Sequence, residues 1–440
     1  MRTLLWLAAG VILGLIFTAM IRKFFVDTSA LAYPMGQAAA ETLIAGDRGG
    51  KKSLLLFISM GVTAVFTFLR DWFMLLPQML FSKVAIPGVS FGVWLSPMMI
   101  AVGYIIGPLP LLVWFIGALI GDFGVVLGGT SLGLWDMTIA SAIKTSLGMG
   151  VMVGTGIGII LKGILPHAKE IFGPMFRRAQ RGDSIVNLRW APWLMLILAA
   201  AFTWLLDMGL LASILTILGV WLTTAMSAQI VGQSGINPME VFGVIVLLAA
   251  RAASSIGQLE AFFVAAIVAV ACGLVGDVMN DFKAGQIVKS DPKAQWFGEA
   301  IGGVVGAAVS VAVLLVLVKA YGTGAFGPGQ TFVAAQASVV AAMVGGIPHI
   351  PAFVIGLLAG AVLYLLRVPV MTLGLGIYLP FYLSLTAFVG GALKFVVEKA
   401  APRFDQSGKG LIIASGCLGG EAVIGVVIAL IQVCLGLTLL

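Results

Sequence analysis

Long apolar runs separated by short polar stretches dominate the chain. A membrane-spanning helix needs roughly 20 mostly apolar residues, and broken helices need fewer. Several of the runs are short or contain Gly and Pro, so some are expected to be re-entrant rather than full spans. The pattern predicts an all-α polytopic membrane protein with about fourteen transmembrane or re-entrant helices. The predicted helices lie near residues 3–21, 54–76, 92–107, 109–128, 140–162, 190–206, 208–226, 237–253, 258–277, 298–319, 331–346, 351–366, 371–397 and 410–438.

The composition supports a protein embedded in a lipid bilayer. The chain has 440 residues, of which 60% are hydrophobic and 10% charged, whereas ordinary globular proteins are about 45–50% apolar and about 25% charged. The first apolar run, residues 3–20, is longer than the hydrophobic region of a signal peptide, so we read it as a retained helix. The net charge of +7 is better explained by basic cytoplasmic loops than by a nucleic-acid partner.

Most of the basic residues gather in four stretches. These are residues 21–53, 162–189, 278–297 and 398–409, and four predicted helices separate each stretch from the next. An even number of helices returns the chain to the same side, and an excess of Lys and Arg marks the cytoplasmic side. The pattern therefore predicts that these loops are cytoplasmic, that both termini lie outside, and that the protein resides in the cytoplasmic membrane.

Weak self-similarity suggests two related halves within a single transmembrane domain, 1–440. The sequence AETLIAGDRGGKK can be aligned with MNDFKAGQIVKSDPK, and ALIGDFG at 118–124 resembles GLVGDVM at 273–279. Halves of about 1–226 and 227–440 would suit a transporter, because repeats in such proteins frame a central site. Chance similarity in so biased a composition is the competing explanation.

Carboxylates within the apolar segments are the first functional candidates. Asp277, Asn280 and Asp281 follow the i, i+3, i+4 spacing that places side chains on one helical face, at the expected end of a helix. Gly285 can end such a helix. Glu421 lies among glycines in the last apolar run, and Glu41 follows a run of alanines. Ionisable groups at membrane depth are functional candidates by default, so all four acids are candidates for proton coupling, although a helix cap or a solvated loop would also explain them.

Breaks within apolar segments are candidates for binding a substrate. Asn237 lies in GQSGINPMEVFG and His349 in GGIPHIPAF, and each stretch is either an unwound binding segment or a plain turn. Pro380 interrupts GIYLPFYLSL and predicts a kink. His349 is also a candidate proton carrier.

Other functional classes find little support. The three cysteines and two histidines are widely spaced, so no metal site and no cofactor are predicted. The chain has no Walker A sequence, which argues against a nucleotide-driven pump. The Gly–Asp pairs at 121–122 and 276–277 resemble half of an intramembrane aspartyl protease motif, and that enzyme class remains an alternative.

Four motifs together resemble the oligopeptide transporter (OPT) family, which includes the yellow stripe-like metal-chelate transporters. They are TyrPro-x-Gly with AlaGlu at 33–41, GlyAsp…Asp-x-Lys-x-Gly…ProLysAlaGln at 276–295, Gly-x-TyrLeuPro with GlyGly at 376–391, and GlyGluAla…Gly at 420–425. The motifs occur in the family's order and add Tyr33 and Tyr378 to the candidate substrate-binding residues Asn237, Pro380 and His349.

The resemblance implies a secondary transporter rather than an enzyme, with proton-coupled uptake of oligopeptides or metal chelates. The chain departs from the family pattern in two ways. Only about thirty residues precede the TyrPro-x-Gly motif, where relatives carry further helices, and Met35 stands where many relatives have Glu. The short N-terminus suggests a homo-oligomer or a separate N-terminal partner chain, and a non-transporting subunit of a split transporter is a further alternative.

Overall fold

The computed structural model describes residues 2–48, 50–171, 205–326 and 346–435, with residues 193, 194, 197, 198, 200, 201, 337, 340, 341 and 344 between them. Within these ranges the chain is helical apart from turns and one short antiparallel strand pair, in which Met79 lies opposite Trp94. Helices that are long and apolar enough to cross a membrane number eight in the described part of the chain. The predicted all-α, polytopic fold class is confirmed.

The described chain forms two compact units. Unit 1 comprises residues 1–33 and 156–347, and unit 2 comprises residues 34–155 and 348–440. The division into halves at about residue 226 stays a prediction.

Unit 1 is built around one long helix, α12. Helices α1, α10 and α11 pack against α12, and α13 folds back beside it. Val11 and Leu15 of α1 meet Ala307 of α13 in a small apolar core, with Val270 and Leu274 of α12 packed against it. The elements are α1 (Arg2–Arg22), η1 (Lys23–Thr28), η3 (Ile160–Ile164), α10 (Leu210–Ser234), α11 (Met239–Ala253), α12 (Gln258–Val288), α13 (Pro292–Tyr321) and η5 (Thr323–Ala325).

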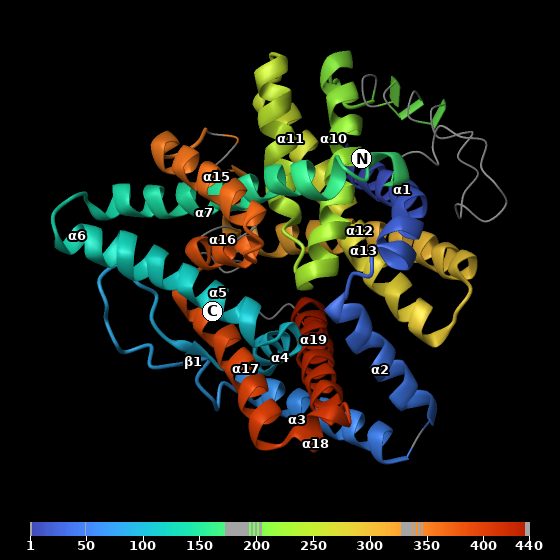
Figure 1. Ribbon diagram of the computed structural model, residues 1–440, viewed down its shortest axis with the longest axis vertical. Helices are drawn as coiled ribbons and strands as arrows, with labels where there is room; N and C mark the ends of the chain where they lie inside the picture. Colours follow the sequence, from blue (N-terminus) through green and yellow to red (C-terminus); the bar gives the residue numbers. More distant parts are fainter. Residues whose placement is uncertain are drawn as a thin grey trace. The chain divides into compact units, whose positions relative to one another are not determined.

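Unit 2 contains most of the shorter helices. Helix α19 packs along α3 and α4, while α16 and α17 pack against α5 and α4 (Figure 1). The elements are α2 (Pro34–Arg48), α3 (Gly50–Asp71), β1 (Met79–Leu80), β2 (Val93–Trp94), α4 (Pro97–Ile106), α5 (Pro108–Ala118), η2 (Leu119–Gly128), α6 (Gly129–Ser131), α7 (Met137–Ile159), α15 (Ile350–Leu365), α16 (Val370–Tyr378), α17 (Phe381–Ala400), α18 (Pro402–Gln406) and α19 (Lys409–Leu435). Helix α7 begins in unit 2 and ends in unit 1.

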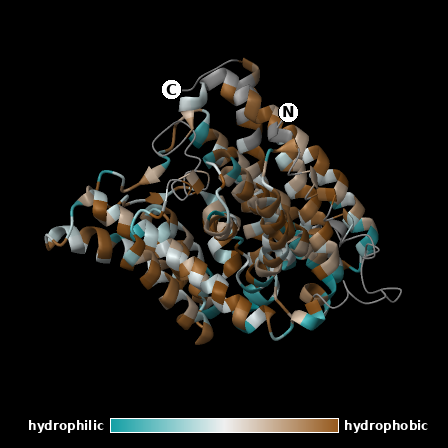
Figure 2. Ribbon diagram, turned by 90° about the horizontal axis from the view of Figure 1, so that it is seen from above, coloured by the Kyte–Doolittle hydropathy of each residue, from teal (hydrophilic) through white to brown (hydrophobic). Residues whose placement is uncertain are grey.

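Glycines allow the helices of unit 2 to cross at close range. A Cβ at Gly103 of α4 would clash with the carbonyl oxygen of Ala387, and one at Gly390 of α17 would clash with that of Ile100. The same reciprocal contact joins Gly117 of α5 to Gly376 of α16. Small residues favour helix association in membranes because they let backbones approach. Apolar residues predominate along the helices (Figure 2).

Several predicted helix boundaries are wrong, and three of them have a clear local cause. The helix expected at 258–277 continues to Val288, because glycine is tolerated within a helix and Gly285 does not end it. The helix expected at 92–107 begins only at Pro97, where Ser96 caps it. The single kinked helix expected at 371–397 is two helices, α16 and α17, separated at Leu379 and Pro380. The helices expected at 190–206 and 331–346 fall largely outside the described residues.

Candidate functional site

Three carboxyl groups meet where α12 and α13 lie side by side. Asp277 and Asp281 are one turn apart on α12, and Glu299 lies near the start of α13. The carboxyl groups of Asp281 and Glu299 lie close enough together to interact, and Asp277 is close enough for its charge to act on both. Asp281 and Glu299 are half-buried, whereas Asp277 is exposed. The sequence named the two aspartates but missed Glu299.

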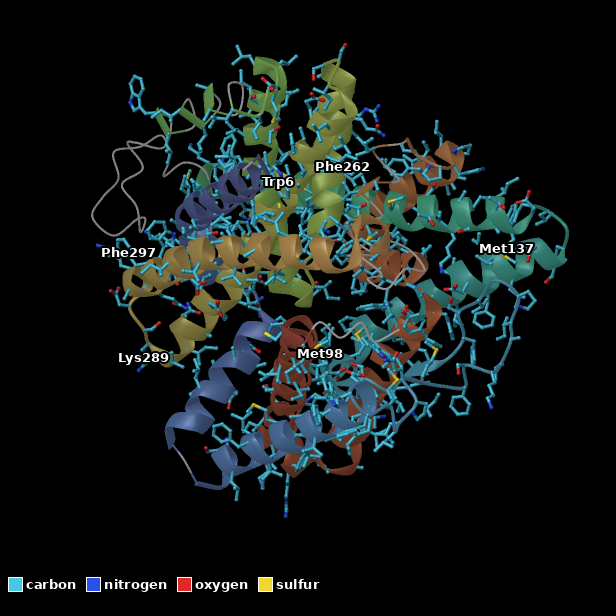
Figure 3. All side chains as sticks on the ribbon, turned by 180° about the vertical axis from the view of Figure 1, so that it is seen from behind. Trp6, Met98, Met137, Phe262, Lys289 and Phe297 are labelled. Atoms are coloured by element: carbon cyan, nitrogen blue, oxygen red, sulfur yellow. The ribbon has the colours of Figure 1, made fainter. Side chains whose placement is uncertain are left out.

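The turn between α12 and α13 places Glu299 opposite Asp281. Lys289 adopts a left-handed conformation with φ of 63°, and Figure 3 shows it at this turn. Asp291 then caps α13 by accepting hydrogen bonds from the backbone N–H groups of Lys293 and Ala294. Gln295 donates its side-chain amide to the carbonyl oxygen of Asp281, which fixes the first turns of α13 against α12.

The three acids form a site that can hold a proton. In the described part of the chain no Lys or Arg lies within ion-pair distance of Asp277, Asp281 or Glu299. Two neighbouring carboxyl groups can share one proton, because like charges close together repel one another. Lys283, the nearest lysine in sequence, donates to Gln286 at 3.0 Å instead.

Asn237 joins the connection between α10 and α11 to the middle of α12. Its side-chain nitrogen donates to the carbonyl oxygen of Cys272 at 2.8 Å. The hydroxyl of Ser227 lies 3.0 Å from its side-chain oxygen. A Cβ at Gly276 would clash with the Asn237 amide, so this side chain lies against the residue that precedes Asp277. The structure thus brings one predicted binding residue against α12 one position before Asp277, with its hydrogen bonds directed at protein groups.

Tyr33 is a packing residue in unit 1. Its side chain is fully buried, and its hydroxyl donates to the carbonyl oxygen of Ala228 at 3.0 Å. Its backbone N–H donates to the carbonyl oxygen of Gly232 at 2.9 Å. Burial raises the pKa of the Tyr33 hydroxyl well above its ordinary value, which keeps the group protonated and donating.

Glu421 lies far from these acids in sequence and belongs to unit 2. One of its oxygens accepts from Arg70 Nη2 at 2.9 Å, and the other accepts from Ser96 Oγ at 3.1 Å and Met98 N at 2.7 Å. Arg70 also forms an ion pair with Asp71. Both carboxylate oxygens of Glu421 are therefore satisfied, and the sequence offered no sign of its distant partner Arg70.

Three of the remaining candidates of unit 2 lie at helix ends, and the fourth, Glu41, lies within a helix. His349 caps α15, since its Nδ1 accepts from Ala352 N at 3.2 Å. Tyr378 ends α16, and Pro380 precedes the first residue of α17. Glu41 lies within α2 and faces the turn between α18 and α19, because its Oε2 would be 3.7 Å from a Cβ at Gly408.

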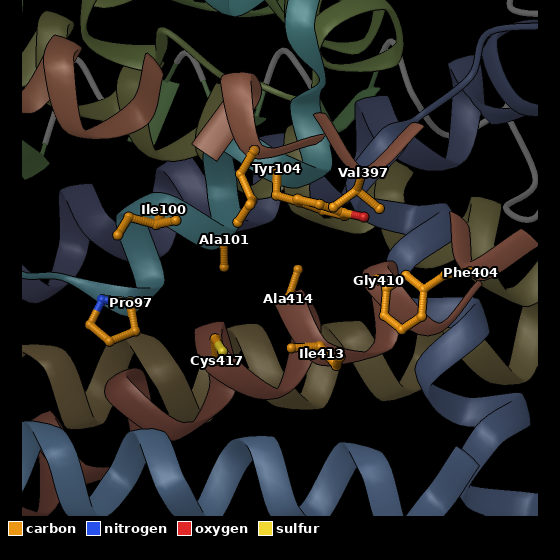
Figure 4. A pocket seen from close by; sticks show the side chains of 11 residues that line it. Pro97, Ile100, Ala101, Tyr104, Val397, Phe404, Gly410, Ile413, Ala414 and Cys417 are labelled. Carbon is orange, nitrogen blue, oxygen red and sulfur yellow. The ribbon is translucent and has the colours of Figure 1, made fainter. Parts of the chain in front are cut away.

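An apolar cavity of about 310 Å³ lies among α4, α17, α18 and α19 (Figure 4). Its lining includes Ile100, Tyr104, Phe404, Ile413 and Ala414. None of the predicted site residues lines this cavity, and its apolar walls suit a hydrocarbon group rather than a charged one.

Comparison with known proteins assigns the family. The sequence model of the family described as OPT oligopeptide transporter protein matches residues 1–432. The chain belongs to the OPT family. It is also similar to the "Putative oligopeptide transporter" of Haemophilus influenzae, with 25% identity over 514 aligned positions that cover 98% of this chain and 81% of the relative. This OPT protein is a multi-pass membrane transporter and not an enzyme, so the protease alternative is dropped.

Proposed function

We propose that this OPT protein is a secondary active transporter of the cytoplasmic membrane that couples the uptake of short peptides to the inward movement of protons. The names of the family and of the Haemophilus relative support a peptide substrate. The contact between the Asp281 and Glu299 carboxyl groups supports proton coupling and is the observation that carries the proposal.

The coupling site in this proposal is the group of three acids on α12 and α13. Asp281 and Glu299 share a proton when the group is loaded, and Asp277 adds a negative charge that favours loading. Loss of the proton leaves neighbouring negative charges that repel one another, which favours separation of the carboxyl groups and a different packing of α12 and α13. Alternation between two such arrangements is what a carrier requires.

The available energy is sufficient for concentrative uptake. One proton moving down a membrane potential of 100 mV releases about 2.3 kcal/mol. Since about 1.4 kcal/mol corresponds to a tenfold ratio, one proton per substrate supports a gradient of roughly 40-fold for a neutral peptide.

The test uses the purified full chain in proteoliposomes with a labelled di- or tripeptide. We expect uphill uptake under an imposed pH gradient, and we expect Asp281→Asn and Glu299→Gln each to abolish it while counterflow exchange survives in at least one of them. Asp291→Asn is the matched control, because Asn also caps helices well and position 291 lies outside the acid group. Wild-type uptake that ignores the pH gradient and a protonophore would refute proton coupling.

The same assay tests whether the other acids named from the sequence take part in proton coupling. Asp277→Asn is expected to weaken coupling, because it removes a charge that favours proton loading. Glu421→Gln and Glu41→Gln are compared in the same vesicles, and normal accumulation in both would restrict coupling to α12 and α13.

A thermal-shift screen with peptides and metal chelates identifies the substrate class, since a ligand that binds only the folded state raises the melting temperature.

A further inference from the structure

A second buried charge pair in unit 2 joins η2 to α7. Lys144 Nζ lies 2.7 Å from Asp122 Oδ1, and it also donates to the carbonyl oxygen of Leu379 at 3.3 Å. The Asp122 side chain is 3% exposed and that of Lys144 is 13% exposed. Charged residues within membrane segments are costly and mark substrate or ion pathways.

The pair lies at two interruptions of regular helix. Asp122 belongs to η2, a stretch of wider π-helical turns that continues α5, and such turns occur frequently at functional sites. Leu379 is the residue between α16 and α17, where Pro380 cannot donate a helical hydrogen bond. A Cβ at Gly121 would lie 2.7 Å from the carbonyl oxygen of Ile377, so the last turn of α16 packs directly against the residue before Asp122.

One carboxylate oxygen of Asp122 accepts no hydrogen bond from the described residues. Asp122 Oδ2 is buried and has no hydrogen-bond partner among the described residues. Glu421, the other deeply buried acid discussed for this unit, has donors on both of its oxygens. Buried polar atoms are nearly always paired, so an orphaned carboxylate oxygen calls for a donor that the described residues do not supply.

We propose that Asp122 is a subsite for the protonated amino group of the transported substrate, with Lys144 holding Oδ1 and the substrate ammonium donating to Oδ2. The subsite rests on the proposed transport of peptides, whose free amino terminus is such an ammonium. A carboxylate has about four acceptor positions and can take two cationic donors. An ammonium on Oδ2 lies nearer to the carboxylate than to Lys144, so the net interaction with the pair is attractive.

Lys144 acts in this proposal as a positioning residue. By bridging Asp122 and the Leu379 carbonyl it holds the carboxylate at the α16–α17 break, where Pro380 has no backbone N–H. In transporters, such broken helices form the sites that hold substrates and ions.

The first experiment compares two probes on the purified full chain in nanodiscs. These are trialanine and N-acetyl-trialanine, which lacks the ammonium. We expect wild type to bind the free peptide about tenfold more tightly, the size of one charge-assisted hydrogen bond. We expect Asp122→Asn to reduce that preference to below about threefold. Asp136→Asn, an exposed change in the same unit where Asn can still accept from Ile139 N, should keep the full preference.

The second experiment needs no peptide. Methylammonium and tetramethylammonium chloride are compared at equal concentration by thermal shift on wild type, Asp122→Asn, Lys144→Gln and the double variant. Lys144→Gln removes the positive charge of Lys144 and keeps a side-chain donor for Asp122. Methylammonium can donate a hydrogen bond to Asp122 and tetramethylammonium cannot, so we expect methylammonium to raise the melting temperature of this variant more. The double variant should show no difference between the two salts. If Lys144→Gln does not fold, wild type and Asp122→Asn give the comparison.

The outcomes separate the subsite from the proposed function. Equal binding of free and acetylated peptide by wild type would overturn the subsite and leave peptide transport standing. The subsite would also be overturned if Asp122→Asn kept the full preference for trialanine over N-acetyl-trialanine, as expected if water alone satisfies Oδ2. Binding of neither peptide, together with an Asp122-dependent methylammonium response, would preserve the amine subsite and refute the peptide substrate. Salt responses that do not depend on Asp122, with no peptide binding, would refute both.

Discussion

Arg70 and Glu421 form a buried ion pair although 351 positions separate them in the chain. Arg70 Nη2 lies 2.9 Å from Glu421 Oε1, and the two side chains are 4% and 7% exposed. The pair joins the end of α3 to α19, the helix that packs along it. Its position explains why an acid is tolerated in the last apolar segment of the chain.

Loss of Arg70 should destabilise the protein more than neutralisation of Glu421. Arg70→Leu leaves Glu421 without its cation and is expected to cost about 3–5 kcal/mol, as for other broken buried pairs. In Glu421→Gln the ion pair of Arg70 with Asp71 remains, and we expect a cost of about 1–3 kcal/mol. The measurement is denaturant unfolding of the purified protein in detergent.

The Glu421→Gln variant also tests whether Glu421 has a role in transport. Because its carboxylate is fully hydrogen-bonded, we expect Glu421→Gln to lower stability while leaving pH-driven uptake per folded molecule unchanged. A variant that folds like wild type but has lost coupling would show instead that Glu421 carries the proton.

Lys289 is expected to face the cytoplasm. It lies at the turn between the candidate spans Gln258–Val288 and Pro292–Leu315, within one of the basic stretches. A single cysteine at position 289, in a background without the three native cysteines, should react with an impermeant thiol reagent only after the membrane is opened. A cysteine at Leu134, beyond the other end of the span Met137–Ile164, should react in intact cells. Arg178, in the basic stretch before α10, lies outside the described residues. Labelling of position 289 from outside would overturn the topology.

Two glycines of α19 should respond oppositely to the same substitution. A Cβ at Gly420 would clash with the carbonyl oxygen of Met60 on α3, so Gly420→Ala is expected to cost about 1–3 kcal/mol. No described atom lies within 4 Å of a Cβ at Gly425. Gly425→Ala should therefore stabilise the helix by about 0.5–1 kcal/mol. Equal effects in unfolding experiments would mean that α3 and α19 do not pack closely at Gly420.

Tyr33→Phe should cost about 0.5–1.5 kcal/mol through loss of the hydrogen bond to Ala228. Burial raises the pKa of Tyr33 in the folded state above its value of about 10 in the unfolded state. The contribution of the Tyr33 hydroxyl to the free energy of unfolding is therefore fully present below about pH 10, and it falls as the pH rises above that value. Melting temperatures of wild type and the variant should therefore converge at alkaline pH. A difference that is constant from neutral to alkaline pH would contradict this.

The fold class could be predicted from the sequence because apolar length is a local property. A bilayer requires stretches of apolar helix, and this requirement is visible without any knowledge of packing. Breaks marked by proline were also visible, as at Pro380. The end of α12 was missed because Gly285 permits either continuation or termination, and the αL turn at Lys289 and the cap at Asp291 decide which occurs.

The sequence by itself determined that this is a polytopic membrane protein, which family it resembles, and which few acids lie in apolar surroundings. Tertiary structure alone decided which groups those acids contact. Asp281 meets Glu299 because α13 folds back on α12, while Glu421 meets Arg70 because α19 lies against α3. Acidic side chains thus form a contact between two carboxyl groups in one unit and a satisfied ion pair in the other. The reason is that the state of a buried carboxylate depends on partners brought to it through space, and sequence spacing does not specify them.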